Sequence, residues 1–303
     1  MELTSNIEIL KTQVQQPTVE KTNNNSMVLK MAQIGFSTVG RVFPSKAAKI
    51  AYKLFTTPRI RARHKKSDQI LESARLFEFI YGKYILKGYE WGSGDRTILL
   101  VHGWESRGTA MRSFVPNLVS AGFKVVAFDG PAHGNSAGKR TNLPHFSGAV
   151  KAIIHYLGGV YGIVTHSFGG ASTVFSLANI DNSISIEKLV LIGVPSSMEN
   201  LSNDFMSMIK APASVARRFE KILESKVGMS LANAHMSNAF EKINVGETLV
   251  VHDRHDQVVP YSEATVVAET WKDTSLLVTE NLGHFQLLKN PELIRRVTNF
   301  VAG

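Results

Sequence analysis

A serine in the middle of the chain lies where the sequence predicts a sharp turn from a strand into a helix. A short apolar run ends near Thr165, Ser167 follows, and an apolar helical segment begins at Ala171. On such a turn the hydroxyl of Ser167 stands clear of the backbone, and the helix N-terminus favours a developing negative charge nearby. The tight turn needs a small residue two positions after the serine, which Gly169 supplies, and Gly170 lets the helix pack closely. The pattern predicts a serine nucleophile.

This turn departs at one position from the common pattern Gly-x-Ser-x-Gly. Thr165 stands where that pattern has its first glycine. Because a bare Ser-x-Gly-Gly sequence also occurs by chance, the interpretation depends on the strand before Ser167 and the helix after it. Both flanking elements are predicted here, so Ser167 remains the predicted nucleophile.

A second segment could complete an oxyanion hole. His102 and Gly103 directly follow the apolar run 97–101. A His-Gly turn at the end of a strand can direct a backbone N–H group, that of Trp104, towards the same oxyanion as the N–H of Phe168. The alternative is an ordinary turn with no catalytic role.

A base and an acid follow later in the chain. His284 comes after the last predicted strand, and Asp256 comes after the strand before it. A histidine can take the proton of a serine because its pKa lies near neutral pH, and a carboxylate can hold the imidazole in the correct tautomer. The carboxyl ends of parallel strands share one edge of a sheet, so Ser167, Asp256 and His284 can converge.

Other polar residues in these loops have different predicted roles. Asp253 is the fallback acid, and Asp129 is a minor candidate that we interpret as a loop-shaping residue. The histidines predicted to shape their loops are His102, His133 and His166.

The framework that must position these residues is visible from about residue 83 onward, where strand-like and helix-like blocks alternate. Residues 84–91 alternate as a half-exposed strand does, whereas the other strand candidates are continuous apolar runs, as strands buried on both faces require. These runs are 97–101, 124–128, 161–165, 188–192, 247–251 and 275–279. The predicted helices are 110–121, 143–157, 261–271 and 291–301. The alternation predicts an α/β fold with a mainly parallel sheet covered on both faces.

One block interrupts the alternation. About 50 residues, 196–245, separate two predicted strands where a crossover needs far fewer, and they indicate two or three helices. The block holds five of the nine methionines and three phenylalanines. Flexible, polarizable side chains suit a cap over an apolar substrate, although each of them could equally pack the block onto the core.

The charge is distributed unevenly. The chain has 303 residues, no cysteine, 44% hydrophobic residues and a formal net charge of +9. The first 90 residues hold 15 basic and 7 acidic residues, whereas the rest hold 19 and 18. Residues 41–66 hold nine basic residues and no acid, with apolar residues at helical spacing. We interpret this segment as a helix packed on the main domain with a solvated basic face, or as a contact with an anionic membrane.

Taken together, the motifs Leu-Leu-Val-His-Gly-Trp, Phe-Asp-Gly-Pro-Ala-His-Gly-Asn-Ser, Thr-His-Ser-Phe-Gly-Gly, Asp-x-x-Val-Val-Pro and Gly-His-Phe resemble the α/β-hydrolase superfamily. Over about residues 84–303 the chain is similar to serine hydrolases of the esterase and lysophospholipase type that carry a helical cap. The resemblance implies Ser167 as nucleophile, His284 as base and Asp256 as acid. It also implies Trp104 and Phe168 as the oxyanion donors.

The expected organisation is a disordered tail (1–26), a basic helical extension (27–82), a hydrolase core (83–195 and 246–303) and a helical cap (196–245). The expected function is hydrolysis of an ester or thioester with an apolar acyl group. We expect no cofactor, no metal and no nucleic-acid partner, and a cytoplasmic location, which fits the absence of cysteine.

Two alternatives remain open. One is a non-catalytic receptor or membrane-associated adaptor on a hydrolase fold. The other is a peptidase in which acids of the cap, Glu199, Glu220 or Glu224, hold a substrate amine.

Overall fold

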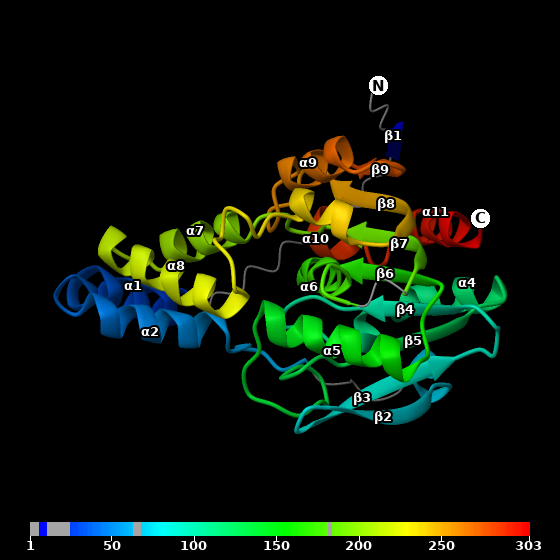
Figure 1. The fold of residues 1–303 in the computed structure, drawn as a ribbon, viewed down its shortest axis with the longest axis horizontal. Coiled ribbons are helices and arrows are strands. Elements are labelled where there is room, and N and C mark those ends of the chain that lie inside the picture. The colour runs from blue at the N-terminus through cyan, green and yellow to red at the C-terminus, as the bar shows by residue number, and fades with distance from the viewer. Residues whose placement is uncertain (1–5, 11–24, 63–67, 181–183) are drawn as a thin grey trace.

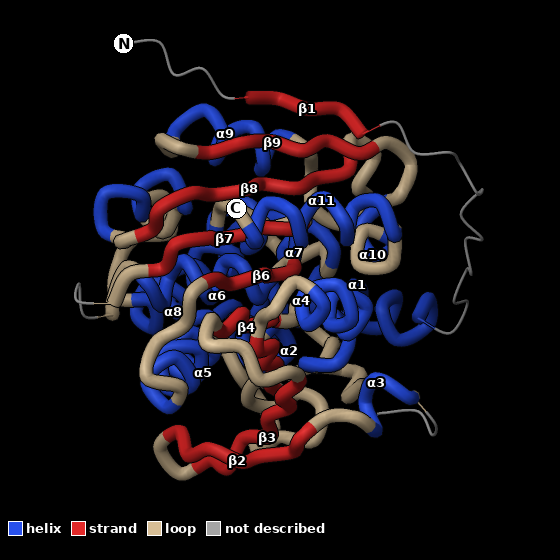
Figure 2. Tube along the Cα trace, turned by 90° about the vertical axis from the view of Figure 1, so that its right-hand side faces the viewer, coloured by secondary structure: helices blue, strands red, loops and turns tan. Residues whose placement is uncertain are grey.

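Nine strands among the described residues form a single mixed sheet. The computed structural model describes residues 6–10, 25–62, 68–180 and 184–303. The order across the sheet is β1-β9-β8-β7-β6-β4-β5-β3-β2, with β2 and β3 antiparallel to their neighbours and the other strands parallel (Figure 2). The strands are β1 (Asn6–Leu10), β2 (Arg75–Tyr81), β3 (Tyr84–Trp91), β4 (Thr97–Val101), β5 (Lys124–Phe128), β6 (Gly162–His166), β7 (Ile186–Ile192), β8 (Val245–Asp253) and β9 (Thr274–Thr279).

Helices connect these strands and cover the sheet (Figure 1). They are α1 (Asn25–Val42), α2 (Pro44–Phe55), α3 (Gln69–Glu72), η1 (Gly108–Phe114), α4 (Val115–Ser120), α5 (Leu143–Tyr156), α6 (Phe168–Leu177), α7 (Met198–Met208), α8 (Ala213–Val227), η2 (Met236–Lys242), α9 (Ser262–Thr270), α10 (Gly283–Gln286) and α11 (Pro291–Ala302), where η denotes a 3-10 helix. None of the described helices is long and apolar enough to cross a membrane.

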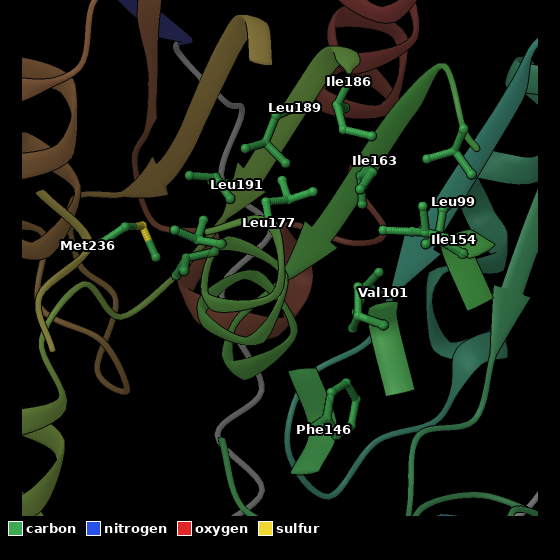
Figure 3. Close-up of a cluster of buried hydrophobic side chains, with 14 of the residues drawn as sticks. Leu99, Val101, Phe146, Ile154, Ile163, Leu177, Ile186, Leu189, Leu191 and Met236 are labelled. Atoms are coloured by element: carbon green, nitrogen blue, oxygen red, sulfur yellow. The ribbon is translucent and has the colours of Figure 1, made fainter. Parts of the chain in front are cut away.

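Each buried strand contributes to two hydrophobic cores, because successive side chains point to opposite faces of a sheet. In β4, Leu99 and Val101 pack with α5, α6 and α9, whereas Ile98 and Leu100 pack with α4 and α11. Figure 3 shows part of the first core, with Leu99 of the sheet among the labelled side chains. The predicted α/β architecture, a mainly parallel sheet covered on both faces, is confirmed.

The first residues depart from the expectation of a loose tail over 1–26. Residues 6–10 form β1, which pairs in parallel with β9 and places Ile7 opposite Leu276. An ion pair between Glu8 and Arg296 ties this strand to α11. This strand was not predicted because five residues with one alternating apolar pair are too weak a pattern. The strand forms because the open edge of β9 supplies its hydrogen bonds. Residues 1–5 and 11–24 lie outside the described residues.

The expected extension 27–82 also ends too late. Residues 75–81 form β2, which makes a hairpin with β3. Gly82 adopts a φ of 56° in the two-residue turn, a conformation that suits glycine. After β1, the sheet therefore resumes at Arg75 and not at residue 83.

The helices α1 and α2 pack on the inserted helices α7 and α8, at the side of the sheet where the parallel strands end (Figure 1). Their shared core includes Phe36 and Ala48 from the N-terminal pair and Met206 and Phe219 from the insert. The N-terminal helices and the insert thus form one helical layer.

The basic helix therefore packs on the insert, where we expected the main domain. Its buried residues are Ala47, Ala48 and Ala51, whereas Ile50 and Leu54 of the expected apolar face are exposed. Small side chains are buried because α2 lies close to α8. Gly40 of α1 also lies close to the insert, since a Cβ atom there would be 3.3 Å from Val215. Residues 63–66 of the basic segment lie outside the described residues.

The shared core predicts that the helical layer contributes to stability. Phe219 is fully buried and its ring lies 5.4 Å from that of Phe55. We expect Phe219→Ala to lower the free energy of unfolding by about 3–5 kcal/mol in urea titrations, because it removes a large apolar side chain and leaves a cavity. The matched control Phe43→Ala, at a ring that is 53% exposed, should change it by less than about 0.5 kcal/mol. Equal effects of the two substitutions would contradict the packing described here.

Candidate active site

Ser167 occupies a strained turn between β6 and α6. Its φ is 53° and its ψ is −129°, a conformation that L-residues rarely adopt. The backbone around it is tightly packed, since a Cβ atom on Gly169 would lie 2.6 Å from the carbonyl oxygen of Val101. A Cβ atom on Gly103 would lie 3.0 Å from the Cβ of Ser167. The predicted need for small residues at this turn is met by Gly169, and also by Gly103 from another loop.

Thr165 fits at the position where the common pattern has glycine. Its hydroxyl donates a hydrogen bond of 2.9 Å to the carbonyl oxygen of Val190 on β7. A Cβ atom on Gly170 would lie 2.8 Å from this hydroxyl oxygen, so the glycine at 170 leaves the space that the threonine fills. The departure at 165 is thus compensated inside the same turn.

His284 and Asp256 meet at the end of the sheet. The imidazole Nδ1 of His284 lies 2.7 Å from Oδ2 of Asp256, and both side chains are buried. The other carboxylate oxygen accepts hydrogen bonds from the backbone N–H groups of Val258 (2.7 Å) and Val259 (3.0 Å). Burial acts to raise the pKa of Asp256, but these hydrogen bonds outweigh it and leave the pKa lowered. Asp256 is therefore a carboxylate that accepts the Nδ1–H of His284.

Contacts around His166 bring the histidine loop next to the serine turn. The Nε2–H of His166 donates to the backbone oxygen of His284 at 3.0 Å, and the two rings lie 4.6 Å apart. On the other side, a Cβ atom on Gly193 would lie 3.2 Å from Nδ1 of His284. His284 is thus enclosed between the residue that precedes Ser167 and the loop after β7. Neither contact was predicted, although an Ile-Gly dipeptide directly after a buried strand was a signal for Gly193.

The two expected oxyanion donors lie on adjoining loops. The rings of Trp104 and Phe168 pack edge to face, 5.3 Å apart. In the part of the chain that the structure describes, the backbone N–H groups of both residues have no hydrogen-bond acceptor. Free N–H groups on two neighbouring turns are what an oxyanion hole requires.

The remaining acids support the loops. Asp253 accepts hydrogen bonds from the hydroxyl of Thr279 and the N–H of Leu282, both at 2.8 Å, and thereby holds the loop that carries His284. Asp129 accepts from Gly108 N–H (2.8 Å) and from the hydroxyl of Tyr89 (2.9 Å). Neither acid contacts His284, so the fallback acid is not its partner in this structure.

Two of the loop histidines act as neutral clamps. His102 accepts the N–H of Gly130 at Nε2 (2.9 Å) and donates from Nδ1 to the oxygen of Gly103 (2.7 Å). His133 likewise accepts the N–H of Glu105 at Nε2 and donates to the oxygen of Pro131. Burial lowers the pKa of His102 to about 4 and that of His133 to about 3. Both imidazoles are neutral at pH 7.

An apolar cavity of about 110 Å³ lies along α6 under the insert. Its lining includes Ala171, Phe175, Met198 and Leu201, but not Ser167, His284 or Trp104. The cavity therefore adjoins the helix of the serine turn and does not contain the site itself. The acids Glu199, Glu220 and Glu224 do not line it either.

A buried carboxylate that the sequence reasoning missed fixes the start of the insert. Glu263 of α9 accepts hydrogen bonds from the N–H of Ser196 (2.7 Å), the N–H of Ser197 (3.0 Å) and the side-chain amide of Asn200 (2.6 Å), and from the hydroxyl of Ser196. A glutamate in a predicted helix gives no sign of such a role, because its partners are about 65 residues away.

Comparisons with known proteins identify a family and two relatives. The model of the Alpha/beta hydrolase family matches residues 98–297. A non-heme haloperoxidase of Rhodococcus erythropolis is 26% identical over 251 residues, which cover 68% of this chain and 91% of that protein. A bifunctional esterase/perhydrolase of Acinetobacter calcoaceticus is 29% identical over 114 residues, which cover 36% of this chain and 41% of that protein.

Solved structures show the same fold. An esterase of Pyrococcus furiosus superposes with a TM-score of 0.62 at 19% identity, over 81% of this chain and 97% of that chain. An esterase of Exiguobacterium antarcticum superposes with a TM-score of 0.56 at 20% identity, over 73% and 96%.

The neutral histidines make stability depend on pH. The pKa of His166 is also lowered, to about 3, by burial and by His284. An unfolded histidine has a pKa of about 6.5, so below that pH the unfolded chain binds protons that the folded chain does not. We expect the free energy of unfolding to fall between pH 6.5 and 4, with a slope approaching about 1.4 kcal/mol per pH unit for each of His102, His133 and His166. Urea titrations across this range measure the slope.

The assignment can be checked residue by residue. In imidazole NMR spectra the signals of the three histidines should not titrate between pH 7.5 and 5. Titration of any of these imidazoles near pH 6.5 would show that it is not held neutral by burial in the folded protein.

Proposed function

The chain belongs to the alpha/beta hydrolase family, and from this membership we propose that it is a serine hydrolase that cleaves a carboxylic ester or thioester with an apolar acyl group. One observation carries the proposal: the hydrogen bond of 2.7 Å between His284 and Asp256, enclosed beside the strained turn of Ser167. Relatives and structural neighbours named esterases support the choice of an ester bond.

In the proposed reaction, Oγ of Ser167 attacks the carbonyl carbon while Nε2 of His284 takes the hydroxyl proton. The oxyanion that forms accepts hydrogen bonds from the N–H groups of Trp104 and Phe168. His284 then gives the proton to the leaving alcohol or thiol, and the acyl group stays on Ser167. A water molecule, deprotonated by His284, attacks this acyl-enzyme, the carboxylic acid leaves, and Ser167 recovers its proton.

Asp256 prepares His284 for this role. Because Nδ1–H of His284 is held by the carboxylate, the other ring nitrogen, Nε2, is the one available as a base. The carboxylate also stabilises the imidazolium that forms when the proton arrives. The loop bonds of Asp256 to Val258 and Val259 hold the acid in place while the charge moves.

The preference for an apolar acyl group is supported by the surroundings of the site. Aromatic rings of Trp104, Phe146 and Phe168 pack together beside the turn. A separate apolar cavity, whose lining includes Phe175 and Met198, lies along α6 under the insert. Burying an acyl chain there would contribute about 0.8 kcal/mol for each methylene group.

Two alternatives are distinguished by the same experiment. A receptor on a hydrolase fold does not need a hydrogen-bonded His–Asp pair. The pair formed by His284 and Asp256 therefore disfavours the receptor. A peptidase needs an anchor for the substrate amine, and the exposed acids Glu199 and Glu220 lie outside the apolar cavity.

The names haloperoxidase and perhydrolase among the relatives suggest hydrogen peroxide as a second acyl acceptor.

We expect Ser167→Ala to abolish both hydrolysis of p-nitrophenyl esters and labelling by a fluorophosphonate probe, because the acyl-enzyme can no longer form. The measurement is a rate screen over esters of increasing chain length, with thioester, anilide and hydrogen peroxide arms. The matched control is Ser176→Ala, which removes from the same helix a buried hydroxyl with no hydrogen-bond partner among the described residues, and which should retain activity.

Hydrolysis that persists in Ser167→Ala would rule out this nucleophile. Folded wild-type protein that is neither labelled nor active on any arm would favour the receptor, and activity confined to the anilide would favour a peptidase.

We also propose that the protein makes contact with an anionic membrane at its cytoplasmic side through an α1–α2 face, defined by the exposed residues Met27, Val28, Met31, Ile34, Val39, Val42, Phe43, Ile50 and Leu54. This face extends the expected contact over 41–66 towards the N-terminus. The sequence from 25 to 62 contains basic residues but no acid, so charge complementarity favours anionic lipid. A cytoplasmic location agrees with the cysteine-free composition.

The membrane contact is tested by co-sedimentation with vesicles. We expect binding to phosphatidylcholine vesicles that contain 30% phosphatidylserine, and at least a tenfold loss of affinity in Met31→Glu/Ile34→Glu, because these changes remove apolar area and add repulsion. The control Leu76→Glu/Ile80→Glu adds the same charges at exposed apolar residues of β2 and should bind as the wild type does. Equal losses in both variants, or no binding of the wild type, would refute the contact.

A further inference from the structure

A second cavity, of about 790 Å³, lies apart from the apolar one and shares no lining residue with it. It is bounded by the end of α2, the β2–β3 turn, the loop 138–142 after β5, the start of α5 and the end of α8. The loop after β5 places it on the edge of the sheet that also carries the candidate active site. Its size is within the range of small-molecule sites.

The cavity is strongly cationic. Its lining contains Arg61, Lys83, Lys139, Arg140 and Lys226, and no aspartate or glutamate. Among the described residues, none of these five side chains forms an ion pair with a carboxylate. Like charges gathered in a concave surface repel one another and focus a positive potential, which an anion relieves.

Hydrogen bonds hold the walls of this cavity in place. The guanidinium of Arg61 donates to the backbone oxygens of Gly134 (2.7 Å) and Ser136, so its charge is fixed at the wall. The N–H of Thr141 donates to the oxygen of Thr56, and the side-chain amide of Asn142 donates to the hydroxyl of Tyr52, both at 2.9 Å. The N-terminal segment and the loop after β5 are therefore joined by hydrogen bonds into one structured wall of the cavity.

The shape and chemistry of the remaining groups favour a phosphate-bearing ligand. The ammonium groups of Lys83, Lys139 and Lys226 and the guanidinium of Arg140 can donate to several phosphate oxygens at once. The N-terminus of α5, a helix of 14 residues, adds positive potential at His145. A single carboxylate would satisfy only part of this set, whereas a phosphate monoester or diphosphate carries the charge to match it.

We propose that this cavity binds a phosphate-bearing small molecule, a phosphate monoester or diphosphate, at a site separate from the esterase centre. The proposal does not depend on ester hydrolysis, because no residue of the proposed reaction lines the cavity. The phosphate could belong to a water-soluble metabolite or to the headgroup of a phospholipid, and the two sources are distinguished by the experiment below.

Isothermal titration with inorganic pyrophosphate tests the site on the intact chain. We expect one equivalent to bind the wild type, with an affinity that falls as ionic strength rises. Lys139→Ala/Arg140→Ala should weaken binding about tenfold or more, because each substitution removes a charge-assisted contact. The matched control Lys272→Ala/Arg217→Ala removes the same charges at exposed positions outside the cavity and should bind as the wild type does.

A parallel titration uses phosphatidylcholine vesicles that contain 10% phosphatidic acid. Loss of pyrophosphate binding in the cavity variant with unchanged vesicle binding identifies a water-soluble ligand, whereas loss of vesicle binding in that variant and not in the control identifies a phospholipid headgroup. The proposal is overturned if pyrophosphate does not bind the folded wild type and the cavity variant binds vesicles as the wild type does, because the α1–α2 face alone would then account for the vesicle binding. It is also overturned if the cavity variant and the control lose binding equally.

Discussion

The arrangement of the site depends on the close approach of backbone segments around Ser167. The serine holds a positive φ, and a Cβ atom on Gly169 would lie 2.6 Å from the backbone oxygen of the neighbouring strand. Such a turn stores strain that the rest of the fold must stabilise. It can do so because β6 lies between β4 and β7, so that buried neighbours hold both ends of the turn. Gly103 and Gly193 come from the loops of those two neighbouring strands, and each leaves space for a residue of the site.

Neutral imidazoles connect the loops around this turn. His102 bridges to the loop after β5 and His133 bridges back to the loop after β4, while His166 reaches the backbone at His284. Each accepts or donates through a defined ring nitrogen, which a charged imidazolium could not do at an acceptor position. The burial that orients these rings also lowers their pKa. The geometry of the site and the loss of folding stability at acid pH therefore have the same cause.

The helical layer over the sheet is built from two distant parts of the sequence. The small residues of α2 face α8, and large apolar side chains of both parts fill the core between them. As a consequence, the outer surface of the N-terminal pair keeps its apolar and basic residues exposed. Glu263 attaches the start of the insert to α9, so the insert is held by a polar contact with the core as well as by packing.

The sequence by itself determined the α/β alternation, the buried strands and the order of serine, acid and histidine at their ends, because hydrophobic period and turn chemistry are local properties. It did not find β1, whose five residues gain their hydrogen bonds from β9, or the end of the extension at β2. It named Asp256 as the acid and kept Asp253 as the fallback. Both follow the same strand, and only the fold shows that one bonds to Thr279 and Leu282 whereas the other meets His284. The partner of α2 and the cationic cavity likewise depend on residues far apart in the chain. Pairings of that kind are decided by tertiary packing, since no local pattern specifies which distant surface a side chain will face.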